Sequence, residues 1–225
     1  MTYQAPVRDY AFLLRDVLQL ERYADLPAFA DASIDTVDAV LEEAGKFTSE
    51  VLAPLNGVGD KEGCVWSPDF TVRTPSGFKD AYAKLVEGGW PGLGSDPTYG
   101  GQGLPHVVNV AFSEMSSSAN MAFSMYPGLT HGAYSAIVVG GTPEQKDLYL
   151  PKLASFQWAG TMNLTEPHCG TDLGLLRTKA VPQADGTYRI SGQKIWISGG
   201  EQDLTENIVH LVLARIEGAP RSEEH

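Results

Sequence analysis

Side chains of the types that take part in catalysis or metal binding are concentrated in one short stretch, TEPHCGTD, at residues 165–172. This stretch places hydroxyl, carboxyl, imidazole and thiol groups close together in the chain. Three kinds of site use such groups: a metal centre, a nucleophile with its base, and a backbone turn shaped around a ligand. Each interpretation implies a different class of protein.

A metal centre would use His168, Cys169 and Asp172 as ligands. We expect adjacent His and Cys side chains on a turn to point apart, and no second cluster of ligands is present in the sequence. A nucleophilic Cys169 would need His168 as its base, but neighbours in sequence rarely meet in space. The sequence therefore predicts neither a metal site nor a catalytic cysteine here.

The backbone interpretation remains for this stretch. A strand that ends in Asn163, Leu164 and Thr165 is followed by Pro167 and Gly170, which favour a turn. Such a strand end exposes main-chain N–H groups together with the Thr165 hydroxyl. A row of donors of this kind suits a flat heterocycle that carries carbonyl and ring-nitrogen acceptors.

Other candidates for chemistry have simpler structural explanations. The glycine-rich run 88–105 lacks the GK[ST] ending of a phosphate-binding loop and follows a helix, so we expect a loop between helices. His106 lies at a helix start and His131 in an apolar helical segment, where histidines are more often structural than catalytic. Glu114 is expected to be a solvated or capped helical carboxylate.

The charge balance excludes several classes of partner. The chain has 225 residues and a formal net charge of -12, which argues against nucleic acid because phosphates require a basic face. No apolar segment is long enough to span a bilayer, and no signal or transit peptide is recognisable. Cys64 and Cys169 belong to no CxxC pair, so no zinc site or disulfide is predicted and we expect a cytoplasmic protein.

The first part of the chain has the apolar periodicity of helices. We expect helices over 7–20, over 35–51 with Pro54 as its stop, over 76–87 with Ser76 as its cap, and from near His106 and Asn120. The sequence TPEQ at residues 142–145 is a capping box with proline at the first helical position. We therefore expect an up-and-down helical bundle, without strands, over residues 1–155.

After Phe156 the pattern changes to runs that are typical of strands. We expect strands over 158–164, 177–181, 188–196 and 208–216, with a hairpin at Asp185–Gly186. The predicted fold class is α+β and multidomain: an all-α N-terminal domain over residues 1–155, then part of an incomplete antiparallel, barrel-like β domain over residues 156–220. Residues 221–225 are expected to be an atypical tail.

Two motifs in this order resemble those of the acyl-CoA dehydrogenase family of flavoproteins. The family patterns read approximately TEPxxGSD and NGxKxWITN, and this chain has TEPHCGTD at 165–172 and SGQKIWISG at 191–199. The runs YGGQGL at 99–104 and GTPEQKDLYLPKL at 141–153 are similar as well. The N-terminal extension resembles the longer subgroup, which includes methylthiopropanoyl-CoA dehydrogenases.

The resemblance implies FAD as cofactor and assigns its contacts. Met162, Leu164 and Thr165 would line the isoalloxazine, and Trp196 would pack on it while the Ser198 hydroxyl points toward it. Thr171 would contact a cofactor phosphate or the CoA arm of the substrate. Thr171 and Ser198 each replace the family's usual residue but keep a hydroxyl group.

The reaction implied by the resemblance is the oxidation of an acyl-CoA thioester to trans-2-enoyl-CoA in fatty acid metabolism. The family's proton-removing glutamate belongs to a C-terminal helical domain that we expect to be missing here, so no catalytic residue is assigned and the chain alone should be inactive. Electron-transfer flavoprotein or a similar acceptor is the implied partner, and a homo-oligomer is expected at full length. The alternative is a non-catalytic flavin or acyl-CoA binding module.

Overall fold

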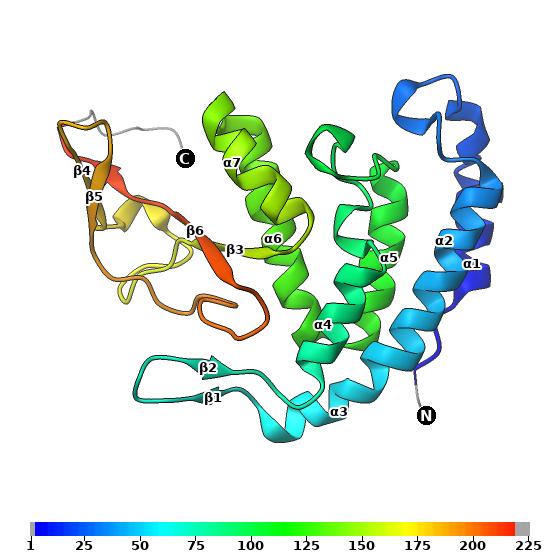
Figure 1. Ribbon diagram of the computed structural model, residues 1–225, viewed down its shortest axis with the longest axis horizontal. Helices are drawn as coiled ribbons and strands as arrows, with labels where there is room; N and C mark the ends of the chain where they lie inside the picture. Colours follow the sequence, from blue (N-terminus) through cyan, green and yellow to red (C-terminus); the bar gives the residue numbers. More distant parts are fainter. Residues whose placement is uncertain (1–2, 219–225) are drawn as a thin grey trace.

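The computed structural model describes residues 3–218, and the expected tail at 221–225 lies outside these described residues. Seven α-helices come first and five of the seven strands follow them (Figure 1). The helices are α1 Val7–Phe12, α2 Ile34–Lys46, α3 Ala53–Glu62, α4 Phe78–Glu87, α5 His106–Ala119, α6 Met121–Gly140 and α7 Pro143–Ala154. The strands are β1 Val65–Trp66, β2 Val72–Arg73, β3 Trp158–Asn163, β4 Lys179–Pro182, β5 Tyr188–Ser191, β6 Asn207–Val212 and β7 Arg215–Ile216.

Local capping determines where several helices begin. The Asn120 side chain is buried and accepts a 3.0 Å hydrogen bond from the Phe123 N–H, which starts α6. The predicted capping box of α7 is present, because the Thr142 and Gln145 side chains each accept a hydrogen bond from the other's backbone N–H.

Three helix boundaries differ from the sequence-based prediction. The helix expected over 7–20 is α1 followed by a π-helical stretch, Leu13–Val17. Pro54 does not stop the second helix: α2 widens into a π-helical stretch, Phe47–Leu52, and α3 continues with Pro54 in its first turn. Proline is tolerated there because the first N–H groups of a helix have no intrahelical partner. Ser76 is also not the cap of α4, because Gly77 occupies that position without a side-chain hydrogen bond.

The helices pack around two apolar clusters. The larger one is built from α2, α4 and α5 with parts of their neighbours, including the fully buried Leu41, Leu85 and Val108. A smaller cluster joins α6 and α7 to the partly buried side of β3 and β6, with Leu150 and Leu153 fully buried. Strand β3 lies directly across α6, so the helical part and the first strand pair share one core.

The glycine-rich run between α4 and α5 is a packed loop, as expected. Residues 88–105 contain two short 3₁₀ turns, Trp90–Gly92 and Pro97–Tyr99. A Cβ atom at Gly101 would lie 2.0 Å from the Ser95 carbonyl oxygen, so close backbone packing explains a glycine at this position.

The strands differ from the prediction in two respects. A short hairpin, β1–β2, interrupts the helical region, where no strands were expected. Strands β3 and β6 pair in parallel, as do β4 and β7, and only β4–β5 forms the predicted antiparallel hairpin. The small sheets do not close into a barrel among the described residues, as expected for an incomplete barrel-like domain. The expectation of an antiparallel unit was therefore wrong for the pairs that are distant in sequence, because no tight turn fixes their direction.

Two predicted strands are shorter than the apolar runs suggested. The expected strand 188–196 ends at Ser191, and the run 208–216 is divided between β6 and β7. The first of these breaks releases residues 192–198, which contain the second motif, from the sheet.

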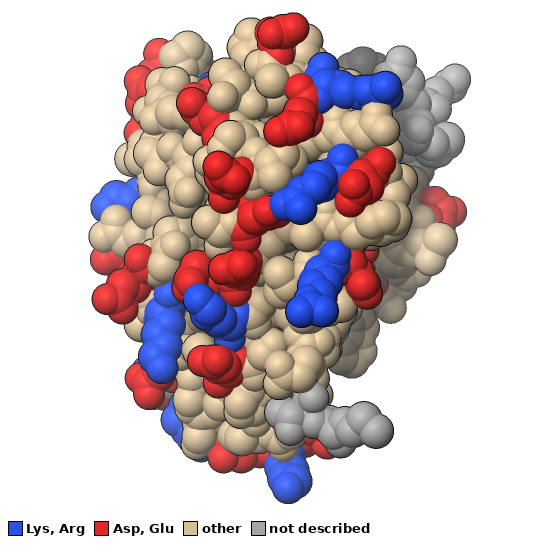
Figure 2. All heavy atoms as spheres, turned by 90° about the vertical axis from the view of Figure 1, so that its right-hand side faces the viewer, with Lys and Arg blue, Asp and Glu red and all other residues tan. Residues whose placement is uncertain are grey.

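The surface agrees with the overall acidic composition. Figure 2 shows the face formed by α1 and α2, where acidic side chains are mixed with basic ones rather than forming a uniform basic surface. No helix among residues 3–218 is long and apolar enough to cross a membrane.

Candidate functional site

The first motif forms a tight turn at the end of β3. Glu166 and Cys169 pair through two backbone hydrogen bonds of 2.8 and 3.1 Å, and Pro167 lies between them. Proline is favoured at a position inside a turn because its φ angle is already fixed. The Arg215 Nε donates a 3.0 Å hydrogen bond to the Leu176 carbonyl and so anchors the segment that follows the turn.

The Glu166 carboxylate is buried at the centre of this turn. It accepts hydrogen bonds from the backbone N–H groups of Arg177 (2.7 Å) and Thr178 (3.0 Å) and from the Lys194 ammonium (2.9 Å). Burial by itself raises the pKa of Glu166, but the hydrogen bonds from Thr178, Arg177 and Lys194 outweigh it and hold the pKa well below its ordinary value. The carboxylate therefore stays charged and has a structural role.

Lys194 joins the second motif to the first. Its ammonium donates to the Leu164 carbonyl at 2.9 Å as well as to Glu166, and the Ile195 N–H donates to the Thr165 carbonyl at 3.0 Å. Both side chains of the ion pair are largely buried. The two sequence motifs are therefore adjacent in space, and their contact depends on a Glu–Lys pair that sequence reasoning did not identify. The signal was a carboxyl in one motif and an ammonium in the other.

The predicted flavin-contacting residues lie at this junction. Met162 is 39% exposed and Trp196 is 86% exposed, which is unusual for large apolar side chains. Trp196 also has a φ of 58°, a left-handed conformation that is uncommon for a residue other than glycine. Among the described residues, no hydrogen-bond partner is found for the N–H groups of Leu164 and Thr165 or for the Thr165 hydroxyl. Donors and an exposed aromatic ring are thus available together.

The other two predicted residues are less closely integrated. Ser198 is exposed in the segment that follows Trp196. Thr171 is exposed beside Asp172, whose carboxylate caps the short 3₁₀ turn Leu173–Leu175 through a 3.0 Å bond from the Gly174 N–H. Within residues 3–218 no hydrogen bond joins Thr171 to the junction of the two motifs.

The argument that His168 and Cys169 could not converge was wrong. The potential ligand atoms of Glu166, His168 and Cys169 all lie within 4.8 Å of one another, because the tight turn folds these side chains to one side. The His168 Nε2 lies 3.1 Å from the Leu175 carbonyl, and Glu166 already holds the Lys194 ammonium. The absence of a metal stays a prediction. Its support is now that the Glu166 carboxylate and the His168 ring already have polar partners, and no longer that the side chains diverge.

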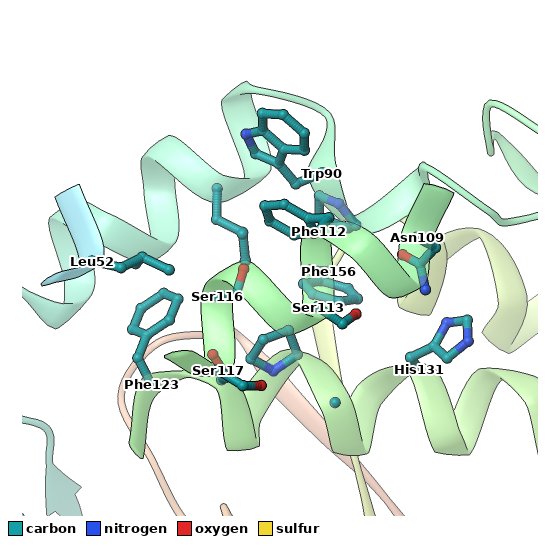
Figure 3. Close-up of a pocket in the computed structure, with 15 residues that line it drawn as sticks. Leu52, Trp90, Asn109, Phe112, Ser113, Ser116, Ser117, Phe123, His131 and Phe156 are labelled. Atoms are coloured by element: carbon teal, nitrogen blue, oxygen red, sulfur yellow. The ribbon is translucent and has the colours of Figure 1, made fainter. Parts of the chain in front are cut away.

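A cavity of about 140 Å³ lies among the helices (Figure 3). Four aromatic side chains line it, namely Trp90, Phe112, Phe123 and Phe156. The lining also contains polar side chains, namely Asn109, Ser113, Ser116, Ser117, Ser124 and His131. The Ser116 hydroxyl is buried without a hydrogen-bond partner among the described residues. Burial, together with the neighbouring His106, lowers the pKa of His131 and favours its neutral form.

Comparison with known proteins agrees with the motifs. Residues 34–157 match the family model described as the N-terminal domain of acyl-CoA dehydrogenase. A 3-methylmercaptopropionyl-CoA dehydrogenase of Ruegeria pomeroyi is 48% identical over 98% of this chain. The chain spans 37% of the length of that relative.

Solved structures give the same result. An acyl-CoA dehydrogenase complexed with FAD from Bacillus anthracis matches with a TM-score of 0.65 and 29% identity, over 84% of this chain and 30% of its own. A structure described under the electron transferring flavoprotein of Acidaminococcus fermentans matches with a TM-score of 0.62 and 28% identity, over 73% of this chain and 40% of its own. The order of the two motifs, their contact in space and these matches together show that the chain belongs to the acyl-CoA dehydrogenase family.

Proposed function

We propose that this chain forms part of the FAD site of an enzyme that oxidises acyl-CoA thioesters to trans-2-enoyl-CoA. The observation that carries the proposal is the junction of the two motifs, where unpaired backbone donors lie at the end of β3 near the exposed Trp196. We also propose the division of the chain into a helical domain over residues 1–155 and part of a β domain over residues 156–220.

The residues present fit a flavin. A flat, partly polar heterocycle needs hydrogen-bond donors for its pyrimidine edge and an apolar surface for its ring faces. Leu164 and Thr165 provide the donors, Trp196 and Met162 provide the apolar surface, and Ser198 adds a hydroxyl. Thr171 is proposed to contact a phosphate or the CoA arm. Bound FAD would supply the acceptor for the electron pair that leaves the substrate.

The chain's own residues supply rigidity to this site. The Glu166–Lys194 pair fixes both motifs before a ligand arrives, so less conformational entropy is lost on binding. No residue of this chain is proposed as the proton-removing base, and Glu166 is unsuited to it because its carboxylate is buried and hydrogen-bonded. The base is proposed to lie in a further helical domain outside these residues.

The flavin site is tested by titrating the chain with FAD and measuring the quenching of flavin fluorescence. We expect Trp196→Ala to weaken FAD binding about fivefold, because an aromatic stacking contact contributes on the order of 1 kcal/mol. Trp66→Ala is the matched control, since Trp66 is another exposed tryptophan (60% exposed) but lies on the β1–β2 hairpin. Equal effects of both substitutions would contradict the assignment.

The cavity supports an acyl group as the part of the substrate that is buried. Gly128 lines it, and a Cβ atom at this position would meet nothing within 4 Å. In the complete enzyme, Gly128→Leu should fill the cavity and raise the KM for longer acyl-CoA substrates more than for short ones. Gly140→Leu is the control on the same helix, because Gly140 is equally open but does not line the cavity. Parallel changes in KM for both variants would reject this role.

Four further features of the whole protein are proposals. The name of the R. pomeroyi relative makes 3-methylmercaptopropionyl-CoA the first substrate to test. Electron-transfer flavoprotein is the proposed electron acceptor, and the complete enzyme is proposed to be a homo-oligomer. A cytoplasmic location is proposed because Cys64 and Cys169 are free thiols.

A non-catalytic flavin or acyl-CoA binding module is the second candidate. It is favoured by the state of Glu166, the carboxylate at the junction, which is buried and bonded to Lys194. The two candidates differ in turnover: the complete protein should bleach its flavin on addition of acyl-CoA if it is an enzyme, and should only bind if it is a module.

A further inference from the structure

One acidic side chain bonds the segment that follows the second motif to the helical part. Residues 199–206, which we call the docking loop, connect the Trp196–Ser198 segment to β6 and pass beside α4 (Figure 1). The Asp203 Oδ1 accepts hydrogen bonds from the Thr74 N–H (3.0 Å) and the Thr74 hydroxyl (2.7 Å). Its Oδ2 lies 2.9 Å from the Lys79 ammonium on α4. One carboxylate thus joins three donors from a distant part of the chain.

The environment of Asp203 shows that this contact is structured. Thr74 is 3% exposed, so its hydroxyl and N–H are not available to bulk water. Burial raises the pKa of Asp203, but the hydrogen bonds from Thr74 and the Lys79 ammonium outweigh it and lower the pKa. The carboxylate is therefore charged at neutral pH and holds its partners.

The docking loop is internally rigid. The Gln202 side chain is 5% exposed; its Nε2 donates to the Thr205 hydroxyl at 2.6 Å, and its Oε1 accepts from the Thr205 N–H at 3.2 Å. Leu204 packs against the larger apolar cluster. Because the loop is internally hydrogen-bonded, fixing Asp203 also restricts the positions of both ends of the loop.

Trp196 cannot fix its own position. Its side chain is 86% exposed, so packing does not select its orientation. The chain before it is held by Lys194 and the Ile195 N–H. After it come Gly199, whose Cβ position would be 3.3 Å from the Tyr126 ring, and Gly200, whose N–H donates to the Ile197 carbonyl at 3.2 Å. The next side-chain attachment to the helical part is Asp203.

We propose that Asp203 is a positioning residue for the flavin-binding segment: through the rigid docking loop it holds residues 196–198 against the helical part, where they meet the cofactor. The inference rests on the flavin site proposed above. Asp203 is assigned no contact with the cofactor, and its proposed effect is preorganisation of the segment that carries Trp196.

The test compares Asp203→Ala with Asp185→Ala in the 225-residue chain. Asp185 is a matched control because it accepts the same pair of bonds, from the Thr187 N–H (2.9 Å) and hydroxyl (2.6 Å), but within the exposed β4–β5 turn. Amide hydrogen exchange is measured first, without FAD. In Asp203→Ala the amides of Ile195 and Gly200 should exchange about tenfold faster, while those of α5 stay unchanged. Asp185→Ala should change neither group.

FAD binding is measured second. Asp203→Ala should raise the FAD dissociation constant about tenfold, and Asp203→Asn should have a smaller effect because its amide oxygen still accepts from Thr74. The proposal is overturned if exchange at Ile195 and Gly200 is unchanged, or if exchange accelerates equally throughout the protein, which would indicate a general loss of stability. If the unmodified chain binds no FAD, the flavin site fails for this chain, while hydrogen exchange still decides whether Asp203 positions the segment.

Discussion

At the scale of single residues, the Glu166 carboxylate gives the protein an acid-sensitive contact. Its folded-state pKa lies below the ordinary value, so it stabilises the folded protein at all pH values above the unfolded-state pKa of about 4.3. This contribution is lost as the pH falls below that value. We expect Glu166→Gln to be clearly destabilised at pH 7 and to approach the unmodified protein in stability as the pH is lowered below about 4, as measured by urea unfolding.

Glu42→Gln is the control for this experiment, because Glu42 is an exposed carboxyl on α2 without a hydrogen-bond partner among the described residues. It should leave the free energy of unfolding within about 0.5 kcal/mol of the unmodified value. A constant difference between Glu166→Gln and the unmodified protein at every pH would show that the charge of Glu166 is not the source of its effect.

Thr165 and His168 separate the two interpretations of the first motif. Thr165→Val keeps the side-chain shape and removes a hydroxyl that has no partner among residues 3–218, so the unfolding temperature should hardly change. FAD affinity should fall about threefold to tenfold, as expected for one lost hydrogen bond. Calorimetry and FAD titration measure the two effects.

The corresponding change at His168 should have the opposite pattern. His168→Ala removes the 3.1 Å contact with the Leu175 carbonyl, which holds the turn. It should lower the unfolding temperature of the protein with little effect on FAD binding. Unchanged flavin binding in Thr165→Val combined with its loss in His168→Ala would restore the imidazole as the functional group.

At the scale of elements, the contact between β3 and α6 requires a glycine. A Cβ atom at Gly160 would lie 2.4 Å from the Ala133 Cβ, and Ala133 is completely buried. We expect Gly160→Val to destabilise the protein by about 1–3 kcal/mol through overpacking and to move the strand that leads to Thr165. Denaturant unfolding measures the free energy, and FAD titration measures the displacement.

Gly132→Ala is the matched control, because Gly132 precedes Ala133 on the same helix and has open space around its Cβ position. It should be neutral or stabilise the protein by up to about 1 kcal/mol, since alanine favours the helix more than glycine does. If Gly160→Val is tolerated as well as Gly132→Ala, the strand is not seated on the helix as described.

At the scale of the whole molecule, the 225-residue chain should bind FAD weakly and should not dehydrogenate any acyl-CoA. Trp196 and Met162 are exposed, and the three-stranded sheet β5–β4–β7 has strand edges that could pair with other chains. Absence of a general base commonly lowers a rate on the order of 10²- to 10⁴-fold. We therefore expect concentration-dependent association in size-exclusion chromatography and no dye reduction with acyl-CoA. A monodisperse, yellow and active chain would place a base within these residues.

The sequence by itself determined the features that depend on local chemistry. The apolar stripes of α2 and α4, the helix start near Asn120 and the Thr142 capping box each follow from neighbouring residues, and each is present. The Asp185–Gly186 hairpin is equally local and was predicted correctly. The motifs identified the family because their order and residue types can be recognised without any knowledge of the fold.

Only the tertiary structure decided the features that depend on distant contacts. The parallel pairing of β3 with β6 joins segments separated by many residues, and no local pattern specifies the direction of such a pair. The Glu166–Lys194 bond and the attachment of Asp203 to Thr74 and Lys79 likewise join residues whose types alone allow many partners. From the sequence alone, a charged side chain could pair with any of several side chains of opposite charge. Burial selects one partner, because desolvation makes an unpaired charge costly only where water is excluded.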